Sequence, residues 1–204
     1  MNKSFNFGDG SGVFFTSDTH WGHANIIRFC SRPFVSVEEM NDILIQNWNN
    51  VVPKDGIVFH LGDFAFGGSQ LWNDVLSKLN GHIYLILGNH DRKNLREGYM
   101  QRFELIAPQM QIEIDKQSVY LNHYPFLCYG GSYRDVWQLF GHVHTSKSKN
   151  TGKDFDRLVN LMPTQYDVGA DLNDFTPISW AKLKERIKFQ IDNNTTCLHW
   201  ISNE

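Results

Sequence analysis

Seven side chains of the types that bind metal ions each lie at or just beyond the end of a short apolar run. They are Asp18, His20, Asp63, Asn89, His123, His142 and His144. Any one of them alone would be an ordinary polar residue at the end of a strand, and only their accumulation points to a shared site. Mixed His, Asp and Asn ligation without thiolate suits manganese, iron, zinc, nickel or cobalt rather than a finger-type structural zinc. The pattern therefore predicts a metal site to which several strands contribute.

Apolar periodicity and turn residues indicate the elements that must position these ligands. Strands are expected at 13–17, 57–61, 83–87, 111–114, 119–122 and 136–140. Helices are expected from a capping box at Ser36–Glu39 through Trp48, from Ser69 to a stop at Asn80-Gly81, and from a cap at Thr176-Pro177 through Phe189. Because side chains alternate along a strand, we expect Asp18 and His20 to point the same way. Residues 145–157 are polar and are expected to form an exposed loop.

Length and composition limit the class of protein. The chain has 204 residues, 41% of them hydrophobic and 14% aromatic, which predicts one domain over residues 1–204. A net charge of −3 with scattered basic residues gives no signal for binding a long nucleic acid. Three cysteines without zinc-like spacing, and no signal-like N-terminus, predict a cytoplasmic protein. No apolar stretch reaches the roughly 20 residues of a membrane span.

The ordered blocks D-x-H (18–20), GD (62–63), GNHD (88–91), His123 and GHVH (141–144) resemble the calcineurin-like metallophosphoesterase superfamily. The segments 17–27, 32–34, 168–171 and 176–179 are similar to small stand-alone members from bacteria and phages. The resemblance extends from Val13 to the last helix. It implies an α/β fold, the four-layer α/β/β/α sandwich of two mixed β-sheets with helices outside.

The resemblance also implies how the ligands divide between two divalent ions. Asp18, His20 and His144 would hold one ion, Asn89, His123 and His142 the other, and Asp63 would bridge them. Manganese is the first expectation, with iron, zinc, nickel and cobalt as alternatives. Such a centre is expected to provide a hydroxide that attacks phosphorus in line, and His90 is expected to act as the catalytic acid without binding metal.

Three residues near these blocks are candidates for contacting the substrate: His23, Arg28 and Arg92. Each has a structural alternative, a helix-start histidine for the first and solvated or salt-bridged arginines for the others. The aromatic residues beside the ligand blocks could stack on a nucleobase, although core packing is favoured; they are Trp21, Phe64, Phe66, Tyr124 and Phe126. A structural role is favoured for Asp91, and a solvated or capping role for Asp171.

The expected activity is hydrolysis of a small phosphate ester, with a nucleotide as one candidate and a phosphodiesterase favoured over a phosphomonoesterase. The arginine that follows the equivalent of Asp63 in serine/threonine protein phosphatases is missing, which argues against that class. A nuclease of the same superfamily is a further alternative, but the basic groove that it would need is not visible. A non-catalytic scaffold with this fold would be favoured by degraded motifs, whereas all seven ligand positions and His90 are filled.

Overall fold

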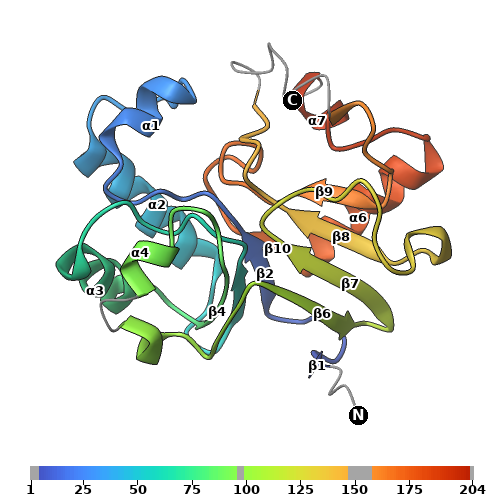
Figure 1. Cartoon of the computed structure of the whole chain (residues 1–204), viewed down its shortest axis with the longest axis horizontal. Helices are drawn as coiled ribbons and strands as arrows, with labels where there is room; N and C mark the ends of the chain where they lie inside the picture. The colour runs from blue at the N-terminus through green and yellow to red at the C-terminus, as the bar shows by residue number, and fades with distance from the viewer. Residues whose placement is uncertain (1–4, 96–98, 147–157, 203–204) are drawn as a thin grey trace.

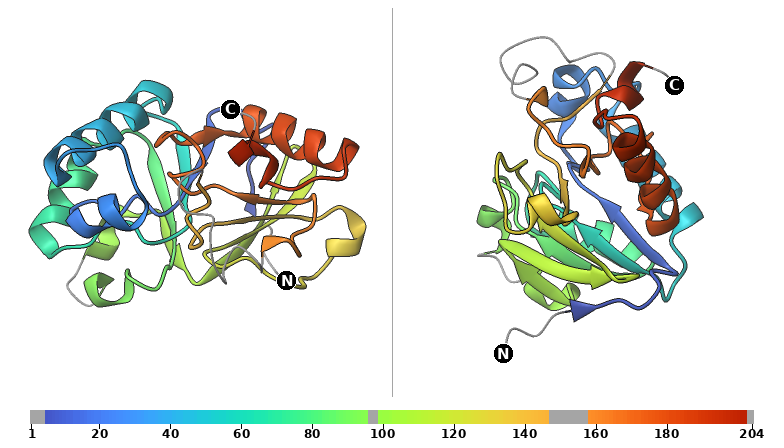
Figure 2. Two further views of the ribbon diagram at one scale, coloured as in Figure 1. Left: turned by 90° about the horizontal axis from the view of Figure 1, so that it is seen from above. Right: turned by 90° about the vertical axis from the view of Figure 1, so that its right-hand side faces the viewer.

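The computed structural model describes residues 5–95, 99–146 and 158–202, in which two five-stranded mixed sheets are flanked by helices (Figure 1, Figure 2). In order, the first sheet contains β10 (Ile178–Ser179), β2 (Val13–Thr16), β3 (Ile57–His60), β4 (His82–Ile86) and β5 (Leu105–Ala107). The second contains β1 (Phe5–Asn6), β6 (Gln109–Ile114), β7 (Gln117–Asn122), β8 (Trp137–Phe140) and β9 (Gln165–Asp167). The predicted α/β/β/α sandwich is confirmed.

Alternation along the strands of the first sheet divides the core into two layers. Phe15 and Phe59 belong to a buried cluster that includes residues of the second sheet, whereas their neighbours Phe14 and Val58 belong to a second cluster with the N-terminal helices. Period-two alternation of this kind means that both faces of the sheet are covered. The strands therefore cannot shift by one residue without exchanging their two buried faces.

Three helices lie over the outer face of the first sheet: α1 (Ala24–Phe29), α2 (Val37–Val51) and α3 (Ser69–Lys78). The Ser36 hydroxyl caps α2 by accepting a hydrogen bond from the amide of Glu39 at 3.2 Å. The Glu39 carboxylate accepts from the amide of Val35 at 2.6 Å, so only the Ser36 half of the predicted capping box is formed as expected. Below the cap, Met40 and Trp48 face the core.

The last long helix begins later than predicted. Helix α6 spans Trp180–Asp192 and is capped by Ser179, whose hydroxyl accepts from the amide of Lys182 at 3.3 Å. The predicted cap at Thr176-Pro177 is wrong because Ile178 and Ser179 instead pair antiparallel with β2 as β10. The Arg186 guanidinium of α6 donates to the Tyr166 hydroxyl of β9, which places this helix against the second sheet.

The remaining elements are short and were not predicted. They are α4 (Arg92–Leu95), α7 (His199–Ser202) and two 3-10 helices at Tyr99–Arg102 and Ser132–Arg134. Most of the loop expected at 145–157 lies outside the described residues, but Thr145 and Ser146 are buried, so the expected exposure is wrong for these two. Within the described ranges, no helix is both long and apolar enough to cross a membrane.

The direction of the strands brings their carboxyl ends to one edge. Strands β2, β3 and β4 are parallel neighbours in the first sheet, and β7 and β8 are parallel neighbours in the second. At this edge an isolated parallel bridge joins Ser17, just after β2, to Gly169, just after β9. The bridge ties the two sheets together where ligand-binding loops are usually found in α/β proteins.

Replacing Leu139 with alanine tests the core that holds the sheets together. Leu139 is fully buried in β8, so Leu139→Ala should lower the free energy of unfolding by about 2–5 kcal/mol through lost burial and a residual cavity. Leu127→Ala makes the same change at a side chain that is 76% exposed and should have almost no effect. Urea denaturation measures both variants. Equal losses of stability would show that Leu139 is not part of this core.

Candidate metal centre

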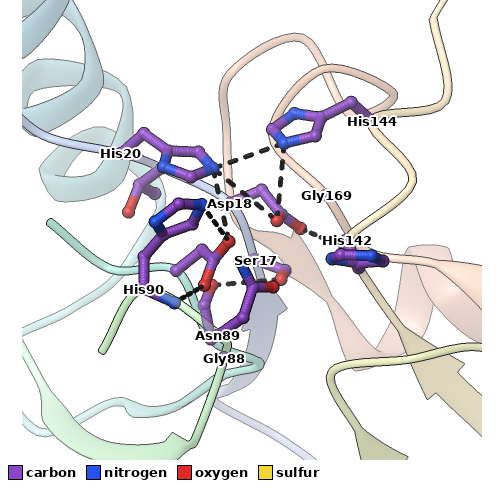
Figure 3. Close-up of polar contacts among 12 residues, drawn as sticks. Ser17, Asp18, His20, Gly88, Asn89, His90, His142, His144 and Gly169 are labelled. Atoms are coloured by element: carbon purple, nitrogen blue, oxygen red, sulfur yellow. Dashed lines mark hydrogen bonds and ion pairs between the residues drawn. The ribbon is translucent and has the colours of Figure 1, made fainter. Parts of the chain in front are cut away.

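All seven predicted ligands lie near the edge where the carboxyl ends of the strands meet, and Figure 3 shows how several of them face one another. Asp18 and His20 follow β2, Asp63 follows β3 and Asn89 follows β4. The other three come from the second sheet: His123 directly follows β7, and His142 and His144 follow β8. Both sheets therefore contribute to the site.

Asp18, His20 and His144 form the first group of potential ligands. The Oδ1 atom of Asp18 lies 3.9 Å from Nε2 of His20 and 3.7 Å from Nε2 of His144, and the two Nε2 atoms are 3.3 Å apart. Asp18 is fully buried, yet its Oδ1 has no hydrogen-bond partner among the described residues. A buried carboxylate oxygen is costly without a partner, and a bound cation would satisfy it. The donor set of this group fits a divalent metal ion.

Asp63, His123 and His142 form the second group, with ligand atoms within 4.8 Å of one another. The Oδ2 atom of Asp63 lies 3.6 Å from Nε2 of His123 and also 3.6 Å from Nε2 of His20, so this carboxylate stands between the two groups. The Asn89 Oδ1 atom lies 3.1 Å from Nε2 of His123. The Asp63 carboxylate therefore lies close to a histidine of each group.

Five of the seven residues have left-handed backbone conformations. Their φ angles are 55° for Asp18, 52° for His20, 55° for Asp63, 72° for His142 and 49° for His144. Asp18 and His20 lie beyond the end of β2, so strand alternation is the wrong reason for their shared direction, although they do converge. Backbone strain of this kind costs on the order of 1–3 kcal/mol per residue and is concentrated at functional sites.

Two glycines let the ligand segments approach closely. A Cβ atom at Gly141 would lie 2.2 Å from Oδ2 of Asp18, and one at Gly88 would lie 2.2 Å from Oδ1 of Asp63. In their place, backbone amides reach the carboxylates: the amide of His142 donates to Asp18 and that of His90 donates to Asp63. The glycines beside the ligands are thus required by space.

Asp91 has the structural role that was predicted. Its carboxylate accepts hydrogen bonds from the amides of Asp63, Phe64 and Gly88 at 2.8–2.9 Å, which joins the loop after β3 to the loop after β4. Burial raises the pKa of Asp91 to about 6, against the opposing effect of these amide donors. The sequence did not reveal that Asp91 connects two ligand loops.

Asp171 is buried rather than solvated, so the role favoured from sequence is wrong. Its Oδ2 atom accepts a hydrogen bond from Nδ1 of His144 at 2.8 Å, and its carboxylate is paired with Arg32. Burial alone would raise the pKa of Asp171, but Arg32 and then His144 hold it well below its ordinary value. Arg32 lies in a segment that the resemblance singled out, but its contact with Asp171 could not be inferred because 139 residues separate them.

The pKa values of the histidines in the site are shifted in different directions. Burial, followed by the charge of His144, holds the pKa of His20 well below its ordinary value, and burial followed by His123 lowers that of His142. Burial would also lower the pKa of His144, but its bond to Asp171 and the charge of Asp18 raise it well above the ordinary value. A low pKa favours the neutral imidazole that metal ions bind.

His60 is a buried histidine outside both groups. Its Nδ1 accepts from the amide of Gly62 at 3.2 Å, so Nε2 carries the proton and donates to the Thr19 hydroxyl at 2.9 Å. Burial lowers the pKa of His60 to about 3, which keeps the ring neutral. His60 therefore stabilises the loops after β2 and β3 through its hydrogen bonds to Thr19 and Gly62.

The structure places His90 and His23 beside the ligands. Nε2 of His90 lies 3.9 Å from Oδ2 of Asp63 and the side chain is 40% exposed. The ring of His23 lies 5.4 Å from that of His20. Arg28 and Arg92 are exposed, and the Arg28 guanidinium lies over the ring of Phe29 at 5.2 Å. Substrate contacts by both arginines stay predictions.

The neighbouring aromatic residues fall into two classes. Trp21 and Phe64 are fully buried, as core packing predicts, while Phe126 is partly buried. Phe66 and Tyr124 are 47% and 43% exposed. The ring of Phe66 stacks on His23 with centroids 4.2 Å apart, and that of Tyr124 lies 4.6 Å from the ring of His142. Two exposed aromatic rings thus border the site.

Comparison with known proteins agrees with this geometry. A family model described as calcineurin-like phosphoesterase matches residues 12–187. An uncharacterized protein of Methanocaldococcus jannaschii is 34% identical over 169 residues, which cover 82% of this chain and 86% of that protein. The Gene 66 protein of Mycobacterium phage D29 is 31% identical over 134 residues, or 57% of this chain and 65% of that protein.

A protein of unknown function from Aquifex aeolicus has a solved structure that shares the fold. Its TM-score is 0.62 at 24% sequence identity, covering 85% of this chain and 97% of that one. The match to the family model over most of the sequence decides the family. This chain belongs to the calcineurin-like phosphoesterase family.

Proposed function

We propose that this protein is a phosphoesterase that uses two divalent metal ions, with a small phosphodiester as the favoured substrate. One observation carries the proposal: the Oδ2 atom of Asp63 lies 3.6 Å from a histidine of each ligand group, His20 of the first and His123 of the second. Membership of the family supports phosphate-ester hydrolysis as the reaction class. A non-catalytic scaffold would not require a complete set of potential metal ligands held in strained backbone conformations.

Asp18, His20 and His144 would hold one ion, Asn89, His123 and His142 the other, and Asp63 both. Divalent ions held by these residues would supply Lewis acidity, which would lower the pKa of a bound water toward about 7 and stabilise negative charge on the phosphoryl oxygens. We propose manganese as the metal, and nitrogen and oxygen donors are equally compatible with iron, zinc, nickel or cobalt.

Three free cysteines support a reducing, cytoplasmic location.

His90 is the proposed general acid. It belongs to neither ligand group, its backbone amide is fixed by Asp63, and its partly exposed ring faces the site. A histidine in this position can donate a proton to the leaving oxygen as the phosphorus–oxygen bond breaks. We place His23 as a phosphate contact, with its ring held between His20 and Phe66.

The exposed rings of Phe66 and Tyr124 support a nucleotide-like substrate. They border the site on the side of His23 and on the side of His142, respectively. Stacking of a base on an aromatic ring contributes about 1–3 kcal/mol, which would favour esters that carry a planar group. A phosphomonoesterase with the same metal centre is the second candidate.

A substrate panel with metal-free protein tests this proposal. Adding Mn²⁺ should restore hydrolysis of bis-p-nitrophenyl phosphate, with p-nitrophenyl phosphate as the monoester comparison. Cyclic and linear nucleotides should be better substrates than dimethyl phosphate, which has no ring to stack. Chelation should abolish every activity. Failure to hydrolyse any ester with manganese, zinc, iron, nickel or cobalt would refute the enzyme assignment.

Replacement of His90 separates proton donation from metal binding. His90→Ala should lower kcat by about 10²–10⁴-fold, because the leaving oxygen loses its proton donor. The metal content should stay at two ions per chain, since the ring is not a ligand. His82→Ala removes an exposed histidine that pairs with Glu104 away from the site and serves as the matched control. Wild-type turnover in His90→Ala would contradict the assigned role.

Metal affinity should weaken as the pH falls, because a protonated imidazole cannot bind a metal ion. His20 and His142 have lowered pKa values and stay neutral, whereas the raised pKa of His144 makes it the ligand at which protons compete first. Below that pKa, displacing one proton weakens the apparent Kd for Mn²⁺ by about tenfold per pH unit. Calorimetric titrations at pH 8, 7 and 6 measure this trend, and a constant Kd would contradict it.

A further inference from the structure

Arg32 and Asp171 form a buried ion pair directly behind His144. The Arg32 Nε donates to Oδ1 of Asp171 at 2.9 Å and its Nη2 donates to Oδ2 at 2.8 Å, while the two side chains are 0% and 2% exposed. Two parallel bonds between a planar guanidinium and a carboxylate fix both groups in one orientation. The lone pairs of the Asp171 carboxylate that Arg32 does not use therefore point in a defined direction.

The Asp171 carboxylate contacts His144, one of the proposed metal ligands. Oδ2 of Asp171 also accepts a hydrogen bond from Nδ1 of His144 at 2.8 Å. The bond places a ring proton on Nδ1 and directs Nε2 toward the other two ligands, 3.7 Å from Oδ1 of Asp18 and 3.3 Å from Nε2 of His20. A carboxylate behind a metal-binding histidine fixes its tautomer and ring orientation and makes the ligand more basic.

Arg32 also holds the loop that carries the other two ligands of this group. Its Nη1 donates to the carbonyl of Thr19 at 2.9 Å and its Nη2 to the carbonyl of Asp18 at 2.6 Å. The flanking residues Asp18 and His20 both have left-handed φ angles, so these bonds stabilise a strained backbone. One guanidinium therefore supports Asp18 directly, His20 through the carbonyl of the preceding Thr19, and His144 through Asp171.

The second group has less support. His123 is fixed, with Nδ1 bonded to the carbonyl of Leu61 at 2.8 Å, but Asn89 and His142 are exposed. Among the described residues, the His142 ring contacts the rings of Tyr124 and His123 and makes no hydrogen bond. Metal binding at this group must therefore order the His142 side chain, which no hydrogen bond from a described residue fixes in advance, and this weakens affinity.

Building on the proposed function, we propose that Arg32 and Asp171 are positioning residues that make the Asp18–His20–His144 group the tighter of two metal sites, so that two ions bind in sequence.

Cys30, His144 and Asp171 also lie close enough to suggest a third metal site. The cation of Arg32 already pairs with Asp171, and Nδ1 of His144 already donates to it, so this cluster supports a ligand and does not bind an ion itself.

Calorimetric titration of metal-free protein with Mn²⁺ tests the proposal without measuring activity. The wild-type chain should bind two ions in separate steps, with the tighter step lost in His20→Ala and the weaker step lost in His142→Ala. Asp171→Asn should weaken the tighter step by about 10–100-fold and leave the weaker step unchanged. Asp174→Asn is the matched control, because Asp174 lies exposed in the same loop; it should behave like the wild type.

Asp171→Asn leaves the Arg32 charge buried without its partner, which can destabilise the fold. Thermal melting of the metal-free variant shows whether it folds. If it does not, the double variant Arg32→Met/Asp171→Asn, which removes both charges, is titrated instead and should show the same selective loss. An unchanged tighter step, or equal weakening of both steps, would overturn the inference. A wild-type chain that binds fewer than two ions would refute the proposed function itself.

Discussion

The site depends on one constraint of the fold: parallel strands from two packed sheets end at the same edge. β2, β3 and β4 deliver their loops from one sheet and β7 and β8 from the other, and the bridge between Ser17 and Gly169 fixes the sheets relative to each other. The first ligand group already combines both sheets, since Asp18 and His20 follow β2 and His144 follows β8. A slip between the sheets would separate these residues.

Bringing the loops together has a cost that the surrounding residues offset. Five of the seven proposed ligand residues adopt left-handed conformations, and two carboxylates are buried close to several imidazoles. Amide donors from His142 and His90 satisfy one oxygen of each carboxylate, while Asp91 and Arg32 hold the loops from behind. The unpartnered Oδ1 of Asp18 is left facing the position that a cation would occupy. Binding of an ion to the folded chain would further stabilise it.

The convergence of the seven proposed ligands at one edge could be predicted because their sequence pattern is local. Each of the blocks at 18–20, 62–63, 88–91 and 141–144 follows an apolar run, and strands that end at one edge are enough to bring them together. His60 lies within such a run and is fully buried. The prediction of one domain over residues 1–204 stays a prediction.

The supporting residues were not predictable from the same signals. The ion pair of Arg32 with Asp171 spans 139 residues, and an aspartate in a polar loop has the sequence signature of a solvated side chain. The left-handed backbone at Asp18 and His20 was not predicted, because Asp and His adopt it more often than other non-glycine residues but still only in a minority of cases. The start of α6 was misplaced because two residues formed an edge strand, which depends on the neighbouring β2 and not on local sequence.

Anomalous diffraction from crystals of this protein soaked in Mn²⁺ would test the two-metal centre most directly. If two ions share Asp63, two peaks about 3.5–4 Å apart should appear on either side of its carboxylate. One should lie beside Asp18, His20 and His144, and the other beside Asn89, His123 and His142. A single peak, or peaks bound by other residues, would contradict it.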